Sequence, residues 1–287
     1  MSELAVHTQG LLKTYGTRKE PYNAVDGLDL DIVHGEVFGL LGPNGAGKST
    51  TVEILEGYRD RTAGTVSVLG EDPQHAGLTW RSKIGIVLQS TNDLSDLTVR
   101  ESLSIFAAYY PRPRDIDEVI DLIGLTDKAN SRASSLSGGL RRRLDVGLGI
   151  IGRPELLFLD EPTTGFDPDA RRQFWSLIES LNEQGTTILL TSHYLDEVEY
   201  LADRVGVISK GKILEVNTPE RLGGREDASA VVTYRDSAGQ TVKISTDEPT
   251  RVVADLAAQH GELTELTGTR PSLEDIYLQM IGKDLSE

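Results

Sequence analysis

The chain has 287 residues, of which 29 are Lys or Arg and 45 are Asp or Glu, so its formal net charge at pH 7 is −16. This charge disfavours a general electrostatic interaction with nucleic acid or anionic lipid. The absence of cysteine excludes disulfides, thiolate metal sites and thiol nucleophiles. The start, MSELAVHTQG, does not resemble a signal peptide, and no run of about 18 apolar residues occurs, so we expect a cytosolic chain that does not itself cross a membrane.

The opening quarter of the chain is predicted to be rich in β-strands. Short runs with strand character alternate there with Gly, Pro and Asn, which favour turns. The predicted strands cover residues 4–6, 24–33, 37–41 and 65–69.

The middle of the chain alternates between strand and helix patterns. Its apolar runs are continuous, as in parallel strands that are buried on both faces, and cover residues 84–88, 156–159, 186–190 and 205–208. Helices are predicted at residues 98–109, 116–123 and 169–181. The first begins with Thr98 and Glu101 at capping-box spacing, and the last follows Asp167 as N-cap and Pro168. The body is therefore expected to be α/β with a covered parallel sheet.

The end of the chain is predicted to form a separate small module. Residues 223–227 are polar and glycine-rich, which is typical of a linker. Strands are expected at residues 230–234, 241–244 and 263–267, and helices at 252–259 and 273–281. We therefore predict one domain over residues 1–222, with a helical subdomain at approximately 90–152, and an α+β accessory domain over residues 227–287.

A phosphate-binding loop is predicted where the strand at residues 37–41 meets the next helix, because the segment fits the pattern GxxxxGK[ST]. Its glycines let backbone N–H groups converge on a phosphate, and the helix N-terminus adds about half a positive charge. Lys48 adds a full charge, and Ser49 can hold Mg²⁺. The predicted nucleoside triphosphate site comprises Gly42, Pro43, Asn44, Gly45, Ala46, Gly47, Lys48, Ser49 and Thr50.

Two carboxylates, Asp160 and Glu161, follow the buried strand at residues 156–159. Ligands of open α/β sheets bind at the carboxyl ends of the strands, so both side chains are expected to face the phosphate loop. Asp160 suits the coordination of Mg²⁺. Glu161, one residue further out, suits a base that polarises the attacking water.

A second exposed helix start is predicted at Ser137, Gly138 and Gly139, with Ser137 as the N-cap, and it is a second candidate anion site. The three arginines at residues 141–143 are interpreted as a solvated face of that helix.

Together these motifs resemble the ATP-binding cassette (ABC) ATPases, because Ser-Gly-Gly comes shortly before Leu-Leu-Phe-Leu-Asp-Glu-Pro, with the phosphate loop far upstream. The resemblance covers residues 4 to about 219. It implies a P-loop NTPase core that binds ATP and Mg²⁺ and hydrolyses ATP.

The resemblance also implies roles for single residues. An aromatic residue ahead of the loop stacks on adenine in this family, which indicates Tyr15, with Tyr22 as the alternative. Gln89 matches the Q-loop residue that contacts Mg²⁺ and water, and His193 matches the histidine that contacts the γ-phosphate. Asp167 lies in a segment similar to the D-loop, where it would contact the opposite subunit.

Two residues depart from the commonest pattern of the family, and they indicate one branch of it. Leu140 stands where the commonest signature has Gln, and Phe166 stands where the D-loop commonly has Leu. A hydrophobic residue followed by arginines is similar to the branch that serves drug and antibiotic exporters, and the ending from Pro271 resembles that branch's C-terminal extension.

The resemblance implies that two such subunits sandwich ATP between the phosphate loop of one and residues 137–139 of the other. They would energise a separate transmembrane permease from the cytoplasmic side of the membrane, with no nucleic-acid partner. The alternatives are a non-transport ABC ATPase acting on nucleic acid or ribosomes, and a P-loop kinase or GTPase. The chain has no heptad run, a single phosphate loop and no Asn-Lys-x-Asp pattern, all of which disfavour these alternatives.

Overall fold

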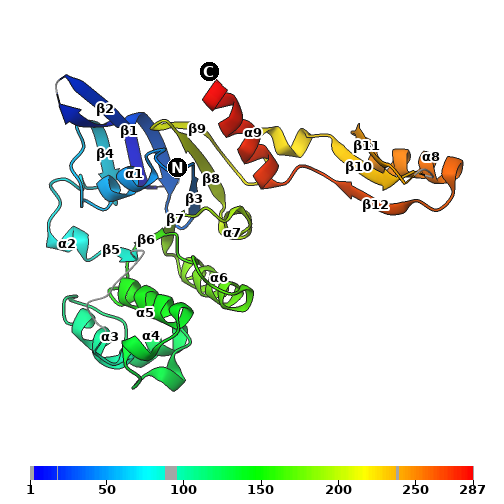
Figure 1. Ribbon diagram of the computed structural model, residues 1–287. Helices are drawn as coiled ribbons and strands as arrows, with labels where there is room; N and C mark the ends of the chain where they lie inside the picture. Colours follow the sequence, from blue (N-terminus) through cyan, green and yellow to red (C-terminus); the bar gives the residue numbers. More distant parts are fainter. Residues whose placement is uncertain (1–2, 18, 88–95, 237–238, 287) are drawn as a thin grey trace. The chain divides into compact units, whose positions relative to one another are not determined.

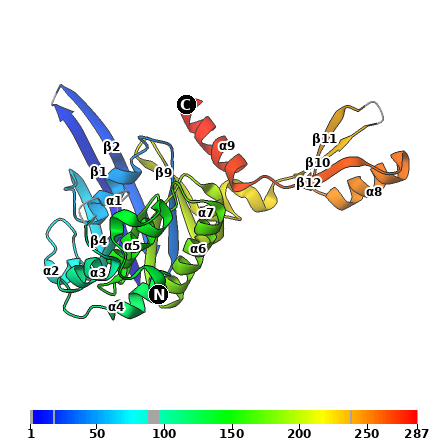
Figure 2. The same ribbon diagram turned by 60° about the horizontal axis from the view of Figure 1, so that its bottom comes forward.

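The computed structural model describes residues 3–17, 19–87, 96–236 and 239–286. The chain divides into two compact units, Met1–Val216 and Asn217–Glu287, whose elements are drawn in Figures 1 and 2. The predicted domain limits at residues 222 and 227 lie inside the second unit. Among the described helices, none has the length and apolar character needed to span a membrane.

A six-stranded sheet forms the centre of the first unit, in the order β5-β6-β7-β3-β8-β9. The pairs from β5 to β8 are parallel, and every residue of β3 and β7 is buried, as expected for strands that are covered on both faces. The strands are β3 (Val37–Leu41), β5 (Ile84–Val87), β6 (Leu156–Asp160), β7 (Thr187–Thr191), β8 (Arg204–Ser209) and β9 (Lys212–Asn217). The carboxyl ends of β3, β6 and β7 therefore share one edge.

Strand β9 was not predicted from the sequence. It follows β8 after a tight turn at Lys210 and Gly211, both of which have positive φ angles. Its side chains are exposed or half-buried, so the continuous apolar run that identified the central strands is missing from it.

A three-stranded antiparallel sheet, β2-β1-β4, completes the β-rich opening. Its strands are β1 (Leu4–Thr17), β2 (Glu20–Val33) and β4 (Ala63–Val68). Strands β1 and β2 are longer than predicted, and β1 pairs with both neighbours. Buried side chains of this sheet, such as Leu11 and Leu28, belong to the same apolar cluster as Phe38 and Leu40 of β3. A shared core thus joins this sheet to the strand that precedes the phosphate loop.

Helices follow the strands as the α/β pattern predicts, and α3, α4 and α5 gather into one helical group (Figure 1). The predicted caps are confirmed: Thr98 and Glu101 form a capping box, and Asp167 accepts hydrogen bonds from the N–H groups of Asp169 and Ala170. The helices of this unit are α1 (Lys48–Leu55), α2 (Leu78–Arg81), α3 (Val99–Ala107), α4 (Ile116–Leu122), η1 (Thr126–Lys128), η2 (Ala133–Ser135), α5 (Gly138–Ile150), α6 (Pro168–Glu183) and α7 (Leu195–Leu201).

The second unit is a small α+β structure with the antiparallel sheet β11-β10-β12. The segment predicted as a linker contains 3₁₀ turns, which are interrupted at Gly223 and Gly224, where the φ angles are 59° and 74°. A Cβ at Gly223 would lie 2.5 Å from Cγ2 of Ile276, so this glycine packs closely against the last helix. The elements are η3 (Leu222–Asp227), β10 (Ala230–Arg235), β11 (Thr241–Thr246), α8 (Pro249–His260), β12 (Thr264–Thr269) and α9 (Leu273–Ser286).

Candidate functional site

The phosphate loop joins the carboxyl end of β3 to α1, and its glycines are required by close packing. A Cβ at Gly42 would lie 2.3 Å from the carbonyl oxygen of Ile208, and one at Gly47 would lie 2.4 Å from that of Ala24. Gly45 and Gly47 also have φ angles of 80° and 108°, in the left-handed region that side chains disfavour. The loop conformation is thus accessible to this sequence because glycine occupies these positions.

Lys48 is the first residue of α1, and its ammonium group lies against the loop. Nζ donates hydrogen bonds to the carbonyl oxygens of Gly42 at 2.6 Å and Pro43 at 3.2 Å. Burial lowers the pKa of Lys48, whereas the nearby carboxylates of Glu161 and Asp160 act in the opposite direction. These carboxylates therefore favour the charged form of the lysine, which a phosphate group needs.

Strand β7 holds the two carboxylates at the end of β6. Asp160 is the register partner of Thr191, whose hydroxyl donates to Asp160 Oδ1 at 2.5 Å. The backbone N–H of Glu161 donates to the carbonyl oxygen of Thr191 at 3.0 Å. Glu161 has a φ of 44°, a strained conformation for a residue other than glycine, and such strain gathers at functional sites.

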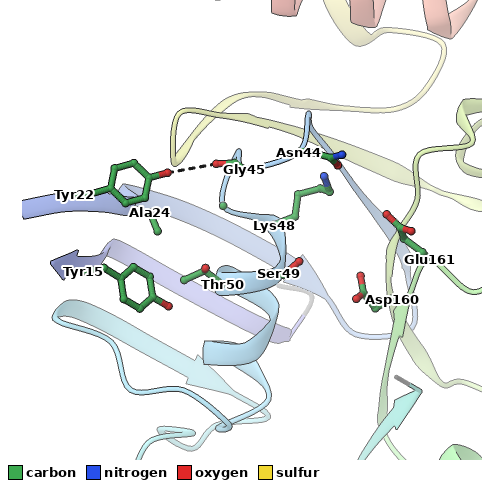
Figure 3. A pocket seen from close by; sticks show the side chains of 11 residues that line it. Tyr15, Tyr22, Ala24, Asn44, Gly45, Lys48, Ser49, Thr50, Asp160 and Glu161 are labelled. Atoms are coloured by element: carbon green, nitrogen blue, oxygen red, sulfur yellow. Dashed lines mark hydrogen bonds between the residues drawn. The ribbon is translucent and has the colours of Figure 1, made fainter. Parts of the chain in front are cut away.

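One cavity of about 480 Å³ brings the loop and the carboxylates together. Figure 3 shows Lys48 and Ser49 on α1 on one side of it, and Asp160, the last residue of β6, with Glu161, the residue after it, on the other. The expected proximity of the carboxylates to the loop is therefore found, whereas the roles of these residues stay predictions. The cavity is lined by Tyr15, Tyr22, Ala24, Asn44, Gly45, Gly47, Lys48, Ser49, Thr50, Asp160 and Glu161.

The two candidate adenine-stacking residues, Tyr15 and Tyr22, are cross-strand partners in the β1–β2 pair. Directly opposed residues of antiparallel strands lie on the same face of the sheet, and both rings line the cavity (Figure 3). The Tyr22 hydroxyl lies 3.5 Å from the carbonyl oxygen of Gly45. Arg59 and Lys13 lie near the Tyr15 ring, with Arg59 Cζ 5.5 Å and Lys13 Nζ 5.1 Å from its centroid. Both tyrosine rings are therefore available to stack on adenine, whereas the sequence analysis treated them as alternatives.

His193 follows β7 and lies beside Glu161, with Nδ1 3.4 Å from Glu161 Oε2. The preceding residue anchors this loop, because the Ser192 hydroxyl donates to the carboxylate of Glu197 at 2.6 Å. Glu197 is completely buried and also accepts a bond from Trp175 Nε1 at 3.2 Å. Sequence reasoning missed Glu197, because a glutamate on an acidic helix gives no local signal of burial.

Residues 137–139 and Asp167 lie outside this cavity. The hydroxyl of Ser137 caps α5 by accepting from the N–H of Leu140 at 3.5 Å. Ser137 and Gly138 are exposed, Gly139 is half-buried, and none of the three lines the cavity of the described chain. Asp167 caps α6, also away from the cavity lining. Gln89 lies outside the described residues.

Comparison with known proteins decides the family. The family model described as "ABC transporter" matches residues 25–164. The daunorubicin/doxorubicin resistance ATP-binding protein DrrA of Streptomyces peucetius is 37% identical, over 97% of this chain and 92% of that protein. The Nod factor export ATP-binding protein I of Rhizobium sp. (strain N33) is 36% identical, over 100% of both chains.

This chain belongs to the ABC transporter family of ATP-binding proteins. A solved structure of the ATP-binding cassette MJ0796, dimeric and in a post-hydrolysis state with ADP and Pi, is similar to 74% of this chain and 98% of that chain. Its TM-score is 0.67 and its sequence identity is 25%. The predicted P-loop NTPase fold and the prediction of an ATPase of this family are confirmed.

Arg142 of this ABC ATPase corrects the interpretation of residues 141–143 as a solvated helix face. Its side chain is only 7% exposed. Nε donates to the carbonyl oxygen of Pro162 at 3.0 Å, and Nη2 donates to that of Asp160 at 2.7 Å. The α5 helix, which begins at Ser137, is thus fastened to the backbone that carries the two carboxylates. A run of like charges could not indicate which member turns inward.

Glu56, at the C-terminal end of α1, is a second residue that sequence reasoning missed. Burial, together with the neighbouring charges of Asp160 and Glu53, raises the pKa of Glu56 to about 8. The folded state therefore holds a proton on this carboxyl at pH values where the unfolded chain, with a pKa near 4.5, has released it.

We expect the stability of the ABC ATPase to depend on pH through Glu56. Its contribution is fully present below about pH 4.5 and is lost as pH rises through about 8. Glu56→Gln, which resembles the protonated form, should therefore raise the free energy of unfolding at pH 8.5 by ~1–3 kcal/mol and change it little at pH 4.5. Denaturant melts without nucleotide or metal across this range measure the effect. Glu71→Gln removes an exposed charge and is the control; a profile for Glu56→Gln parallel to the wild type would contradict the prediction.

Proposed function

We propose that this chain is the ATP-hydrolysing subunit of an exporter whose membrane-spanning part is a separate chain. The observation that carries the proposal is the single cavity in which the phosphate loop, a pair of tyrosines and two carboxylates meet. The names of the relatives, which refer to drug resistance and to Nod factor export, support export as the direction of transport. The cargo we propose is an amphipathic small molecule such as a drug or antibiotic.

The nucleotide would lie with its adenine on Tyr15 or Tyr22 and its terminal phosphates in the loop from Gly42 to Thr50. The donor set suits Mg²⁺, because the Ser49 hydroxyl and the Asp160 carboxylate are the hard oxygen ligands that this ion prefers. Few protein ligands are needed, since Mg²⁺ beside a nucleotide is also held by phosphate oxygens and water. The ion would neutralise charge on the phosphates, and Gln89 is its third proposed contact.

Within the cavity, we assign the chemical step to Glu161. Its carboxylate lines the cavity and would accept a proton from the attacking water, and the strained backbone at this residue supports a functional role. His193, 3.4 Å from that carboxylate, would contact the γ-phosphate. Lys48 would leave the carbonyl oxygens of Gly42 and Pro43 and pair with the phosphates, which are better partners for an ammonium group.

A second copy of the chain would complete the site. The capped helix start at residues 137–139 is largely exposed and is absent from the lining of its own chain's cavity, which supports a role on the nucleotide of a partner. Asp167, on the neighbouring helix start, would contact the same partner. In a two-fold dimer each nucleotide would then lie between one phosphate loop and the Ser137 helix of the other chain.

Mixing two inactive variants tests this arrangement. Lys48→Ala damages a chain's own phosphate loop, and Ser137→Arg damages what it supplies to its partner. A mixed dimer therefore keeps one complete site, while neither parent keeps any. Equal mixing should restore about a quarter of the wild-type ATPase rate, since half the dimers are mixed and each has one complete site of two.

Size-exclusion chromatography with a non-hydrolysable ATP analogue should show the corresponding dimer. Ser176→Arg, on an exposed face of α6, is the control and should behave as the wild type. A mixture that stays inactive and monomeric, or a Ser137→Arg protein that is active alone, would exclude the shared site.

For the chain as a whole, we propose that residues 1–222 form the nucleotide-binding domain, with the helical subdomain at approximately 90–152. Residues 227–287 would form an accessory domain. The subunit would work at the cytoplasmic side of the membrane, bound there through its permease. The net charge of −16 supports a protein partner rather than nucleic acid.

A further inference from the structure

A second cavity, of about 490 Å³, lies at the opposite edge of the central sheet from the nucleotide cavity. Pro154 and Glu155 precede β6 there, and Gly185 and Thr186 precede β7. The two cavities share no lining residue. The other residues that line the second cavity are His34, Arg114, Glu118, Arg153 and Gln184.

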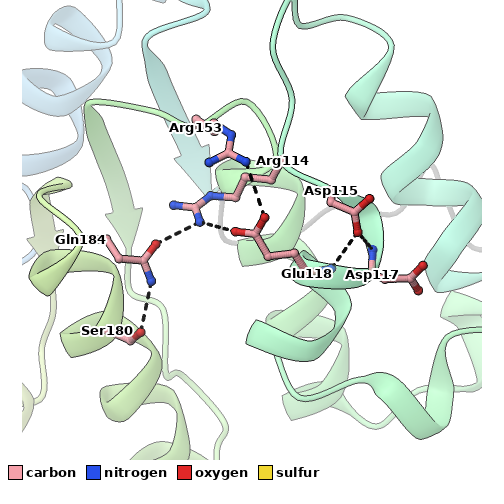
Figure 4. A network of polar contacts seen from close by, with 7 residues as sticks. All are labelled: Arg114, Asp115, Asp117, Glu118, Arg153, Ser180 and Gln184. Atoms are coloured by element: carbon pink, nitrogen blue, oxygen red, sulfur yellow. Dashed lines mark hydrogen bonds and ion pairs between the residues drawn. The ribbon is translucent and has the colours of Figure 1, made fainter.

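Arg114 is the most deeply buried charged group of this cavity, with 8% of its side chain exposed. Its Nη1 donates to Glu118 Oε1 at 3.0 Å and to Gln184 Oε1 at 3.0 Å. Figure 4 shows both bonds leaving the same guanidinium nitrogen. Nε is buried, and no described residue accepts a hydrogen bond from it.

The unused side of this guanidinium has a definite chemistry. Nε and Nη2 form the edge whose two parallel N–H groups match the oxygens of a carboxylate or phosphate. The bonds to Glu118 and Gln184 both use Nη1, so they hold the group in place without occupying that edge. A buried donor without an acceptor lowers the stability of the fold by about 1–3 kcal/mol. An anion that accepts a hydrogen bond from Nε would remove this cost.

The surroundings fix Arg114 and place a second guanidinium group, that of Arg153, beside the same carboxylate. Gln184 donates through Nε2 to the Ser180 hydroxyl at 3.4 Å, which turns its oxygen toward Arg114. Arg153 Nη2 lies 3.5 Å from the second oxygen of Glu118, so two guanidinium groups share one carboxylate. The other acidic residue, Glu155, lies 3.8 Å from Lys83. Two guanidinium groups, those of Arg114 and Arg153, thus line the cavity beside Glu118, while Lys83, the partner of Glu155, is not part of the lining.

We propose that this cavity binds a small oxyanion, a phosphate or a carboxylate, on the Nε–Nη2 edge of Arg114, with Arg153 as the second cationic contact. Arg114 directly precedes the N-cap of α4, in the helical group, and Gln184 ends α6, beside the central sheet. An anion bound on this edge would therefore lie at the junction between these two parts of the first unit. This site is independent of the proposed exporter function.

Calorimetric titration of the full chain tests the site. The protein is first saturated with Mg²⁺ and a non-hydrolysable ATP analogue, so that the phosphate loop is filled. Inorganic phosphate and succinate are then titrated separately at constant ionic strength. Arg114→Lys keeps the charge and removes the two-pronged edge, so it should weaken binding about tenfold. Arg153→Ala removes a half-exposed side chain, so it should leave the fold intact and weaken binding.

Arg251→Lys, in the second unit, is the matched control and should bind as the wild type. Binding of phosphate alone, of succinate alone or of both supports the site and identifies the anion that it prefers, provided that Arg153→Ala weakens it. Unchanged affinity in Arg114→Lys and Arg153→Ala, or no binding of either anion to the wild type, would overturn the proposal. If Arg114→Lys does not fold, Arg153→Ala alone decides between these results.

Discussion

Replacing Glu161 by Gln should lower the steady-state rate of ATP hydrolysis by about 10²-fold or more while ATP binding is retained. Glutamine has nearly the same shape as glutamate, and the backbone bond from residue 161 to the carbonyl oxygen of Thr191 does not depend on the side chain. The amide cannot accept a proton from water at neutral pH. The variant therefore keeps the cavity and loses the base.

The two halves of this result are measured separately. Calorimetry with Mg²⁺ and ATP gives the affinity, and phosphate release gives the turnover. Glu155→Gln is the matched control, because Glu155 directly precedes the same strand and is exposed. Wild-type turnover in Glu161→Gln would remove the proposed base, and a loss of ATP binding would mean that the side chain shapes the cavity.

Lys48→Ala should weaken the binding of ATP by about 10²-fold or more, since a charged group contributes about 1.5–3 kcal/mol to each hydrogen bond it makes. Nζ is held by two carbonyl oxygens of the loop, and Lys48 lines the cavity. The substitution removes a positive charge that faces Asp160 and Glu161, which leaves these carboxylates to repel the phosphates.

The measurement is calorimetric titration with Mg²⁺ and ATP, after a thermal melt has shown that the variant is folded. Lys83→Ala removes a partly exposed lysine outside the nucleotide cavity and serves as the control. Lys48→Arg should also bind poorly, because a planar guanidinium is not a substitute for a compact ammonium group in a tight loop. Unaltered affinity in Lys48→Ala would contradict the proposed phosphate site.

Local patterns predicted the parts of this protein that depend on neighbouring residues. The phosphate loop, the strand that ends in Asp160 and the helix caps at Thr98 and Asp167 each depend on hydrogen bonds or burial within a few positions of the chain. The edge of the sheet at which the carboxylates meet the loop could also be predicted, because parallel strands present their carboxyl ends together.

The sequence by itself thus determined the α/β body, the glycine pattern of the loop and the family of ATPases to which the chain is similar. Tertiary structure decided which side chains turn inward and meet across long separations in the sequence. Arg142 reaches Asp160, Tyr15 faces Tyr22 in one strand register, and Arg114 meets Gln184 across the junction with α6. These contacts depend on strand register and helix packing. Both are relations between segments far apart in the sequence, so the residues around one position do not reveal them.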